Sequence, residues 1–303
     1  MTEQTALTGV FSPVLTPFST DYKPHIPRYI EHCRNLLLQG VGLAIFGTNS
    51  EANSLGMAEK RQLLDALLQD GLPAGRMMPG TGACSVSESI EMTRHAVTSG
   101  CAGVLMLPPF YYKGVSDEGL FRHFAQVIEG VGDSRLRLYL YHIPPVSQVG
   151  ISHTLIERLL EAYPGIVAGL KDSGGDWSNT ESLIRTFQPE GFQVFAGTET
   201  VLLNTLKAGG AGCITATANV NAAPIMQLYR TWQSNNAQAQ QESINKTRAV
   251  FQALPMIPAM KAAIAWRTNT PEWRTVRPPL VELAEEQAQQ LRTNLQELES
   301  AVD

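Results

Sequence analysis

The 303-residue sequence lacks the usual signatures of several protein classes. No run of like charges accompanies the formal net charge of −5, which argues against a nucleic-acid or membrane-surface partner. The polar start of the chain has no basic stretch followed by an apolar one, and no apolar run is long enough to span a bilayer. We therefore expect a cytoplasmic protein whose partner is a small molecule.

Cysteine, metal and nucleotide motifs are also missing. The four cysteines form no CxxC pair, so we expect buried free thiols. The six histidines are scattered without HExxH or HxH spacing, which predicts no metal site. Neither GxGxxG after a strand nor GxxxxGK[ST] occurs, so the sequence has no nucleotide-binding motif that would indicate hydride or phosphoryl transfer. We expect no metal and no organic cofactor.

Short apolar runs typical of buried strands alternate with segments of helical periodicity. Eight such units without a dividing linker favour an α/β fold, a (β/α)8 TIM barrel over residues 1–220. Residues 221–303 carry only helical signals and predict a C-terminal helical extension packed on the barrel. The eight runs are Val10 to Thr16, Gly42 to Gly47, Arg76 to Gly80, Gly103 to Leu107, Leu136 to Tyr141, Ile166 to Lys171, Phe192 to Gly197 and Gly212 to Thr215.

In such barrels the chemistry lies at the carboxyl ends of the strands. Of only seven lysines, Lys113 and Lys171 alone follow predicted strands. Lys171 ends an apolar run, where burial disfavours the charged form and frees an amine to attack a carbonyl. The alternative is a structural lysine paired with a carboxylate such as Asp172 or Glu199.

An imine mechanism needs proton relays and, for a 2-oxo acid, an anion site. Tyr112 and Tyr141 follow strands and could relay protons, or could simply fill the top of the barrel. The loop from 47 to 51, GTNSE, could bind a carboxylate through backbone N–H groups, Thr48 and Asn49. The alternative for this loop is a capping turn without a ligand.

Together these pieces resemble the dihydrodipicolinate synthase and N-acetylneuraminate lyase superfamily, the class I pyruvate-dependent aldolases. The resemblance covers nearly the whole chain. Its motifs are Thr16-Pro17-Phe18, GTNSE at 47–51, PGTGA at 79–83, PPFYYK at 108–113, YHIP at 141–144, GLKDSGGD at 169–176, AGTE at 196–199 and TANV at 217–220.

The resemblance implies a role for each matching residue. Lys171 would form the Schiff base, Tyr141 would shuttle protons, and Tyr112 would be the relay tyrosine that many members insert into a neighbouring subunit. Thr48 and Asn49 would bind the substrate carboxylate. The same analogy implies a homotetramer built as a dimer of dimers. Positions matching contacts to the distal part of the substrate are Ser173, Gly197, Glu199 and Ala216.

Departures from the family pattern bear on the substrate. Val146 stands where dihydrodipicolinate synthases carry an arginine for the second substrate's carboxylate, and Glu199 lacks the acidic neighbour of the sialic-acid branch. Ser50 replaces a usual glycine, so the turn either avoids a positive φ or accepts strain. His142 replaces a common asparagine and could titrate near the substrate, or could be a packed, hydrogen-bonded histidine.

The leading hypothesis is a lyase that forms a Lys171 Schiff base with pyruvate or another 2-oxo acid. It would cleave or form a C–C bond of a 4-hydroxy-2-oxo acid or related sugar acid. The KDSGGD stretch together with Asn49 looks similar to 4-hydroxy-2-oxoglutarate aldolases. Alternatives are a 4-hydroxy-tetrahydrodipicolinate synthase, a 2-keto-3-deoxy sugar acid dehydratase, and a non-catalytic 2-oxo-acid-binding protein.

Overall fold

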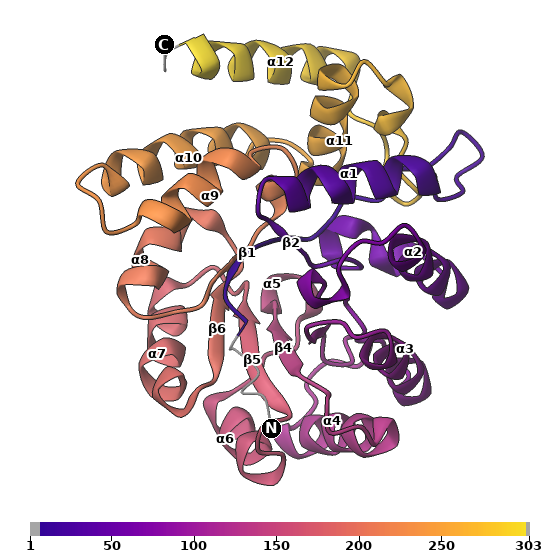
Figure 1. Ribbon diagram of the computed structural model, residues 1–303, viewed down its shortest axis with the longest axis vertical. Coiled ribbons are helices and arrows are strands. Elements are labelled where there is room, and N and C mark those ends of the chain that lie inside the picture. Colours follow the sequence, from indigo (N-terminus) through magenta and orange to yellow (C-terminus); the bar gives the residue numbers. More distant parts are fainter. Residues whose placement is uncertain (1–6, 301–303) are drawn as a thin grey trace.

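The computed structural model describes residues 7–300 and places a curled parallel sheet inside a surround of helices (Figure 1). Within these residues seven strands pair in the order β2-β1-β7-β6-β5-β4-β3. Parallel strands that are buried on both faces consist of continuous apolar runs, and for this reason the apolar runs in the sequence predicted where the strands lie. The strands are β1 (Gly9–Ser12), β2 (Gly42–Leu43), β3 (Val104–Met106), β4 (Leu138–His142), β5 (Val167–Asp172), β6 (Gln193–Ala196) and β7 (Gly212–Ile214).

Helices connect successive strands and cover the sheet (Figure 1). α4 illustrates the local rules: the Ser116 hydroxyl accepts the N–H of Gly119, and the helix ends at Gly132 with φ 63°. The helices are α1 (Ile26–Leu38), α2 (Met57–Gln69), α3 (Val86–Thr98), α4 (Asp117–Val131), α5 (Pro144–Ser147), α6 (His153–Ala162), α7 (Trp177–Phe187), α8 (Leu202–Lys207), α9 (Ala222–Thr231), α10 (Ala237–Gln252), α11 (Met256–Arg267) and α12 (Glu285–Ser300).

The third apolar run does not form a regular strand, so an eight-stranded barrel is not confirmed. It lies between β2 and β3 and touches them only through isolated parallel bridges, Met77 with Leu43 and Gly80 with Leu105. Pro79 lacks an N–H and cannot donate to a ladder, which interrupts a regular strand there. The architecture is therefore an α/β fold with a curled seven-stranded parallel sheet.

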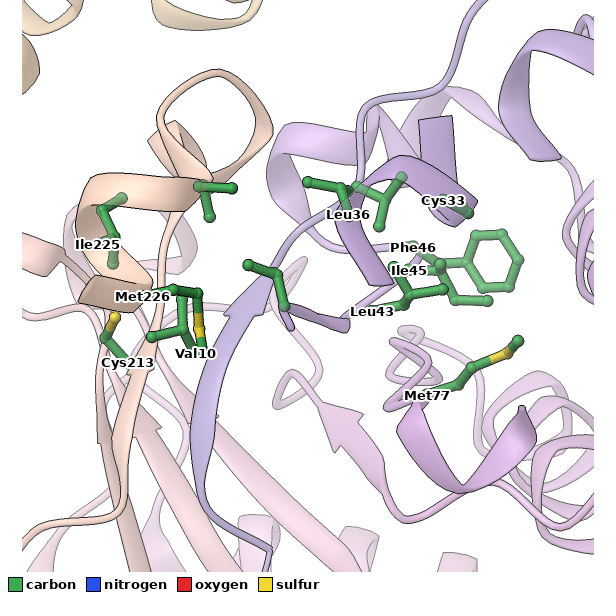
Figure 2. Packing of buried hydrophobic residues seen from close by; sticks show 14 of the residues in the cluster. Val10, Cys33, Leu36, Leu43, Ile45, Phe46, Met77, Cys213, Ile225 and Met226 are labelled. Carbon is green, nitrogen blue, oxygen red and sulfur yellow. The ribbon is translucent and has the colours of Figure 1, made fainter. Parts of the chain in front are cut away.

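The core on one side of the sheet joins its first strands to the last helix of the barrel region. Figure 2 shows Val10 of β1 beside Met226 of α9, and Leu43 of β2 on the side of Leu36 of α1; these residues and Ile225 of α9 belong to one cluster. These side chains are almost fully buried. α9 therefore packs on the sheet, although it lies within the residues that the sequence assigns to the extension.

The helices after α9 contribute to a second apolar cluster. Phe251 of α10, Met260 of α11 and Leu291 of α12 pack together with Leu15, which follows β1. This apolar contact holds the helices beside the segments that follow β1 and β7, which contribute Leu15 and Ala216.

No single helix among residues 7–300 is long and apolar enough to cross a membrane. α10 and α11 pass the length and composition test only when they are taken together, and they meet at a bend of 107°.

All four cysteines are free, but their burial differs from the expectation. Cys33 and Cys213 are buried, Cys101 is intermediate and Cys84 is exposed. Burial raises the pKa of the Cys101 thiol to about 12. The prediction of buried thiols is therefore wrong for Cys84, which lies in the loop that follows the PGTGA motif.

Candidate active site

The first contact of the site comes from two neighbouring strands. Tyr141 on β4 and Lys171 on β5 are register partners, so the parallel pairing places their side chains next to each other. Lys171 Nζ donates a hydrogen bond to Tyr141 Oη at 3.2 Å, and the same nitrogen lies 4.2 Å from the centroid of the tyrosine ring. Each residue is only 3% exposed. A primary amine and a phenol thus meet in a nearly water-free position.

Thr48 reaches the same tyrosine from the loop after β2. Its hydroxyl lies 3.3 Å from Tyr141 Oη. The loop is shaped by Ser50, whose Oγ accepts the N–H of Gly47 at 3.0 Å and whose carbonyl accepts the hydroxyl of Thr16 at 2.8 Å. Ser50 has no positive φ, so the turn avoids the left-handed conformation at that position. Asn49 is half-buried beside Thr48.

The phenol of Tyr141 is biased toward ionisation by its neighbours. Burial is the largest single influence and raises its pKa, because it penalises the charged form. The charge of Lys171 and hydrogen bonds with Thr48, Lys171 and Ser173 oppose burial and together outweigh it. The net result is a lowered pKa for Tyr141, as suits a group that must give up a proton and recover it.

Lys171 is not held by an ion pair with any carboxylate among residues 7–300. Asp172 instead accepts the hydroxyl of Thr180 at 2.7 Å and the amide of Asn179 at 2.9 Å. Glu199 is engaged elsewhere, by Arg248. The structural alternative considered from the sequence therefore finds no partner in the described residues, and the amine faces the tyrosine.

Ser173 lies two residues beyond Lys171 and shares its face of the chain, which brings its hydroxyl to Tyr141. Gly197, after β6, makes room for it. A Cβ at Gly197 would lie 2.0 Å from Ser173 Oγ and 2.7 Å from the carbonyl oxygen of Asp172. Only glycine permits this close approach, and the Gly197 N–H uses it to donate to the Asp172 carbonyl at 2.6 Å.

The structure does not bring His142 to the Lys171–Tyr141 pair. Successive residues of a strand face opposite sides, so His142 points away from the side that carries Tyr141. Its Nδ1 accepts the N–H of Ile151 at 3.0 Å. Burial lowers the pKa of His142, against an opposing influence from the charge of Asp172. This placement matches the packed, hydrogen-bonded histidine that the sequence left open.

Glu199 lies in a buried polar cluster after β6, and Ala216 lies after β7 in the apolar cluster that contains Leu15 and Phe251. The Glu199 side chain is completely buried and accepts the hydroxyls of Thr215 and Thr217. The guanidinium of Arg248, on α10, forms an ion pair with Glu199, with Nη1 lying 3.1 Å from Oε2. Ala216 is 4% exposed between the two threonines. The carboxylate of Glu199 therefore already has three partners from the protein itself.

Tyr112 lies apart from these buried residues, on an exposed loop. Its side chain is 73% exposed and packs edge to face against Tyr111, with ring centroids 5.3 Å apart. Lys113 anchors the loop by donating to the Ser147 carbonyl at 2.8 Å. In the single chain, Tyr112 thus presents its hydroxyl to the outside.

Two buried residues near the site were missed by the reasoning from sequence. Glu51 and Lys261 form an ion pair with both side chains fully buried, directly after the Thr48 turn. Lys261 is 210 positions away in the sequence, and its only signal was a lysine within the otherwise apolar helix MIPAMKAAIAW. Among residues 7–300, no group of three or more His, Cys, Asp or Glu side chains is placed to hold a metal ion.

Comparison with known proteins identifies the family. The model of the Dihydrodipicolinate synthetase family matches residues 6–298. The chain belongs to this family. It is 31% identical over 289 residues to an uncharacterized DapA-like lyase of Chloroflexus aurantiacus, with 94% of each chain covered. It is 28% identical over 306 residues to the putative 2-dehydro-3-deoxy-D-gluconate aldolase YagE of Escherichia coli, covering 98% of this chain and 99% of that one.

Solved structures agree with the family assignment. Dihydrodipicolinate synthase from Agrobacterium tumefaciens superposes with a TM-score of 0.88 at 30% identity, covering 96% of this chain and 99% of that chain. YagE from E. coli, solved in complex with pyruvate, gives 0.87 at 28% identity, with 96% and 98% covered. The resemblance inferred from the motifs is confirmed. As a member of the Dihydrodipicolinate synthetase family, the chain is a Schiff-base-forming lyase of the class I aldolase type, whose substrate these comparisons leave open.

Proposed function

We propose that Lys171 forms the Schiff base with pyruvate or a related 2-oxo acid, and that the enzyme cleaves or forms a C–C bond of a 4-hydroxy-2-oxo acid or related sugar acid. The observation that carries this proposal is the 3.2 Å contact between Lys171 Nζ and Tyr141 Oη at paired strand positions. An amine alone can attack a ketone, but loss of water from the carbinolamine needs a proton donor within reach.

The proposed cleavage has a balanced course. The neutral amine of Lys171 adds to the keto carbon, and water leaves after protonation of the carbinolamine oxygen by Tyr141. The resulting phenolate takes the proton of the C4 hydroxyl. The C3–C4 bond then breaks, an aldehyde leaves, and the bonding electrons pass to the iminium nitrogen to form an enamine. Protonation at C3 and hydrolysis release pyruvate and restore the amine.

Thr48 and Asn49 are proposed to bind the carboxylate of the 2-oxo acid. The Thr48 hydroxyl already lies 3.3 Å from Tyr141 Oη, so a carboxylate bound there would sit beside the relay. Ser173, Gly197 and Ala216 are proposed to face the remainder of the substrate. For Glu199, a direct contact requires the substrate to compete with Arg248 and two threonines.

The residue at position 146 bears on the choice between the candidate reactions. Val146 is 62% exposed and offers no charge for a second carboxylate. This counts against a second substrate held by its carboxylate at this position, as in a 4-hydroxy-tetrahydrodipicolinate synthase. Product analysis separates the remaining alternatives, because an aldolase yields pyruvate plus an aldehyde whereas a dehydratase keeps the carbon skeleton intact.

The deciding experiment is reductive trapping. Incubation with pyruvate and borohydride should add a carboxyethyl group to the peptide that contains Lys171, detected by mass spectrometry. Lys171→Met should abolish the adduct, and Lys207→Met, which removes an exposed helical lysine, should leave it unchanged. An unmodified Lys171 under conditions that trap a reference aldolase would refute the proposal.

The assembly and the closure of the sheet are also proposals. We infer that residues 77–80 take the place of an eighth strand and close the sheet into a barrel. The isolated bridges to Leu43 and Leu105 support this. We also infer that the exposed Tyr112 serves a neighbouring subunit within a cytoplasmic homotetramer, as the family resemblance suggests. Analytical ultracentrifugation tests the tetramer, and mixing Tyr112→Phe with Lys171→Met subunits tests whether sites are shared.

A further inference from the structure

Glu51 closes the turn that presents Thr48, and its backbone is left-handed, with φ 57° and ψ 34°. Its N–H donates to the Thr48 carbonyl at 3.2 Å. A residue with a Cβ is strained in this conformation and keeps it only where its surroundings hold it. The position of the Thr48 hydroxyl therefore depends on whatever fixes Glu51.

The side chain of Glu51 is fixed by the C-terminal helical region. Lys261 of α11 donates to Glu51 Oε1, and both side chains are fully buried. The backbone N–H of Arg277 donates to Glu51 Oε2 at 2.8 Å. Lys261 Nζ also donates to the Thr275 carbonyl at 2.8 Å and lies 4.4 Å from the centroid of the Phe18 ring. Both carboxylate oxygens are thus held by residues more than 200 positions away.

Stability alone gives little reason for such a pair. Removing two charges from water costs about as much as their attraction returns, so an apolar pair of similar volume would serve the fold equally well. Burial lowers the pKa of Lys261 to about 8, against the charge and hydrogen bond of Glu51, which raise it. Unlike apolar packing, these polar contacts fix the orientation of the carboxylate, because Lys261 holds Oε1 and the Arg277 N–H holds Oε2.

We propose that Glu51 and Lys261 are positioning residues, which hold the Thr48 loop in the geometry that receives the carboxylate of the 2-oxo acid. The C-terminal helical region is then part of the active site, although within residues 7–300 none of its side chains forms a hydrogen bond or ion pair with Lys171. The inference rests on the proposed function, because it assumes that Thr48 binds that carboxylate.

The test measures the pyruvate concentration that gives half-maximal borohydride trapping at Lys171. Glu51→Gln keeps the shape and one acceptor oxygen, whereas Lys261→Met removes the charge with little change of volume. Both should raise the half-trapping concentration by about tenfold or more, because a small misplacement of a binding group weakens its contact steeply. If Lys261→Met fails to fold, Glu51→Gln decides alone.

Two further variants separate positioning from general loosening. Arg28→Met breaks the 3.2 Å ion pair between α1 and Glu272, which also ties the barrel to the C-terminal region but does not touch the Thr48 loop. It should leave trapping within about twofold at a temperature where circular dichroism shows every variant folded. Thr48→Val removes the hydroxyl through which Glu51 is proposed to act. Adding Glu51→Gln to Thr48→Val should therefore raise the half-trapping concentration much less than Glu51→Gln does in the wild type.

The outcomes are distinct. Wild-type protein that is not trapped at Lys171 overturns the proposed function, and this inference with it. Wild-type protein that is trapped, with both Glu51→Gln and Lys261→Met within twofold of it, overturns the inference alone. So does an equal shift in Arg28→Met, or a full additive shift in the double variant with Thr48→Val.

Discussion

Tyr141 lies with its ring beneath the amine of Lys171 and its hydroxyl as that amine's hydrogen-bond acceptor. The two contacts serve different purposes. The ring packs against the amine and shields it from water, while the hydroxyl can exchange protons with it. A change that keeps the ring and removes the hydroxyl separates these purposes.

Tyr141→Phe should lower kcat/KM by about a hundredfold to ten-thousandfold, because the proton relay is lost while the packing remains. Steady-state kinetics with the substrate found by product screening measure this, and thermal unfolding checks that the fold is intact. Tyr139→Phe is the matched control, since Tyr139 is equally buried on the same strand and two residues earlier. Retention of full activity by Tyr141→Phe would assign the relay to another group.

The pKa of Tyr141 should depend on the residues around its hydroxyl. Its pKa is lowered, so the native protein should contain a tyrosine that ionises below the usual range, and its tyrosinate absorbance should disappear in Tyr141→Phe. In Lys171→Met the pKa should rise, because burial is then opposed only by hydrogen bonds. A difference titration that finds no early tyrosine in the wild type would contradict the geometry.

The same shift has a consequence for stability. A tyrosine with a lowered native pKa binds fewer protons when folded than when unfolded, between its native value and about 10. The free energy of unfolding from this group therefore rises with pH across that window and declines as pH falls through the native pKa. Denaturant titrations of the wild type and Tyr141→Phe at several pH values should differ in this slope. Equal slopes would show that the native and unfolded pKa values are the same.

Gly197→Ala should damage the site through contact alone. The new Cβ would press against Ser173 Oγ and the Asp172 carbonyl, which should cost about 1–3 kcal/mol of unfolding free energy and displace Ser173 from Tyr141. Gly75→Ala is the control, because no atom lies within 4 Å of a Cβ added there. Urea denaturation and kinetics measure the two effects. A Gly197→Ala protein as stable and active as the control would show that Ser173 and Asp172 can move away from the new Cβ at little cost in free energy.

Glu199→Ala should act mainly on stability. It would leave the Arg248 guanidinium beside the Thr215 hydroxyl without its counter-charge, at a cost of about 3–5 kcal/mol for a largely buried pair. Glu190→Ala, at an exposed position, should change the free energy of unfolding little. If Glu199→Gln leaves stability intact but raises KM, the carboxylate contacts substrate after all.

Part of this structure follows directly from the sequence. The apolar runs marked all seven strands, and the chain order placed Tyr141 and Lys171 at the ends of consecutive runs, so their adjacency could be anticipated. The orientation of His142 was also available, because the residue after an inward-facing tyrosine in a strand must face outward. The strand rule favours the packed alternative for His142, and substrate binding by this residue stays a prediction.

Other features needed the folded chain. Nothing local to Glu199 indicates that its partner is Arg248 on α10, and nothing local to Glu51 indicates Lys261, because such pairs form only when distant helices pack. Sequence patterns fix elements and faces, whereas partner choice between distant elements is decided by tertiary packing.

The reactive residues and the proposed recognition residues lie on different segments of the chain, which matters for redesign of the site. The reactive amine and phenol stand on adjacent hydrogen-bonded strands, while the groups proposed to recognise the distal substrate stand on the segments that follow β5, β6 and β7. Libraries confined to those segments could therefore exchange one acceptor aldehyde for another and leave the bond-making apparatus untouched.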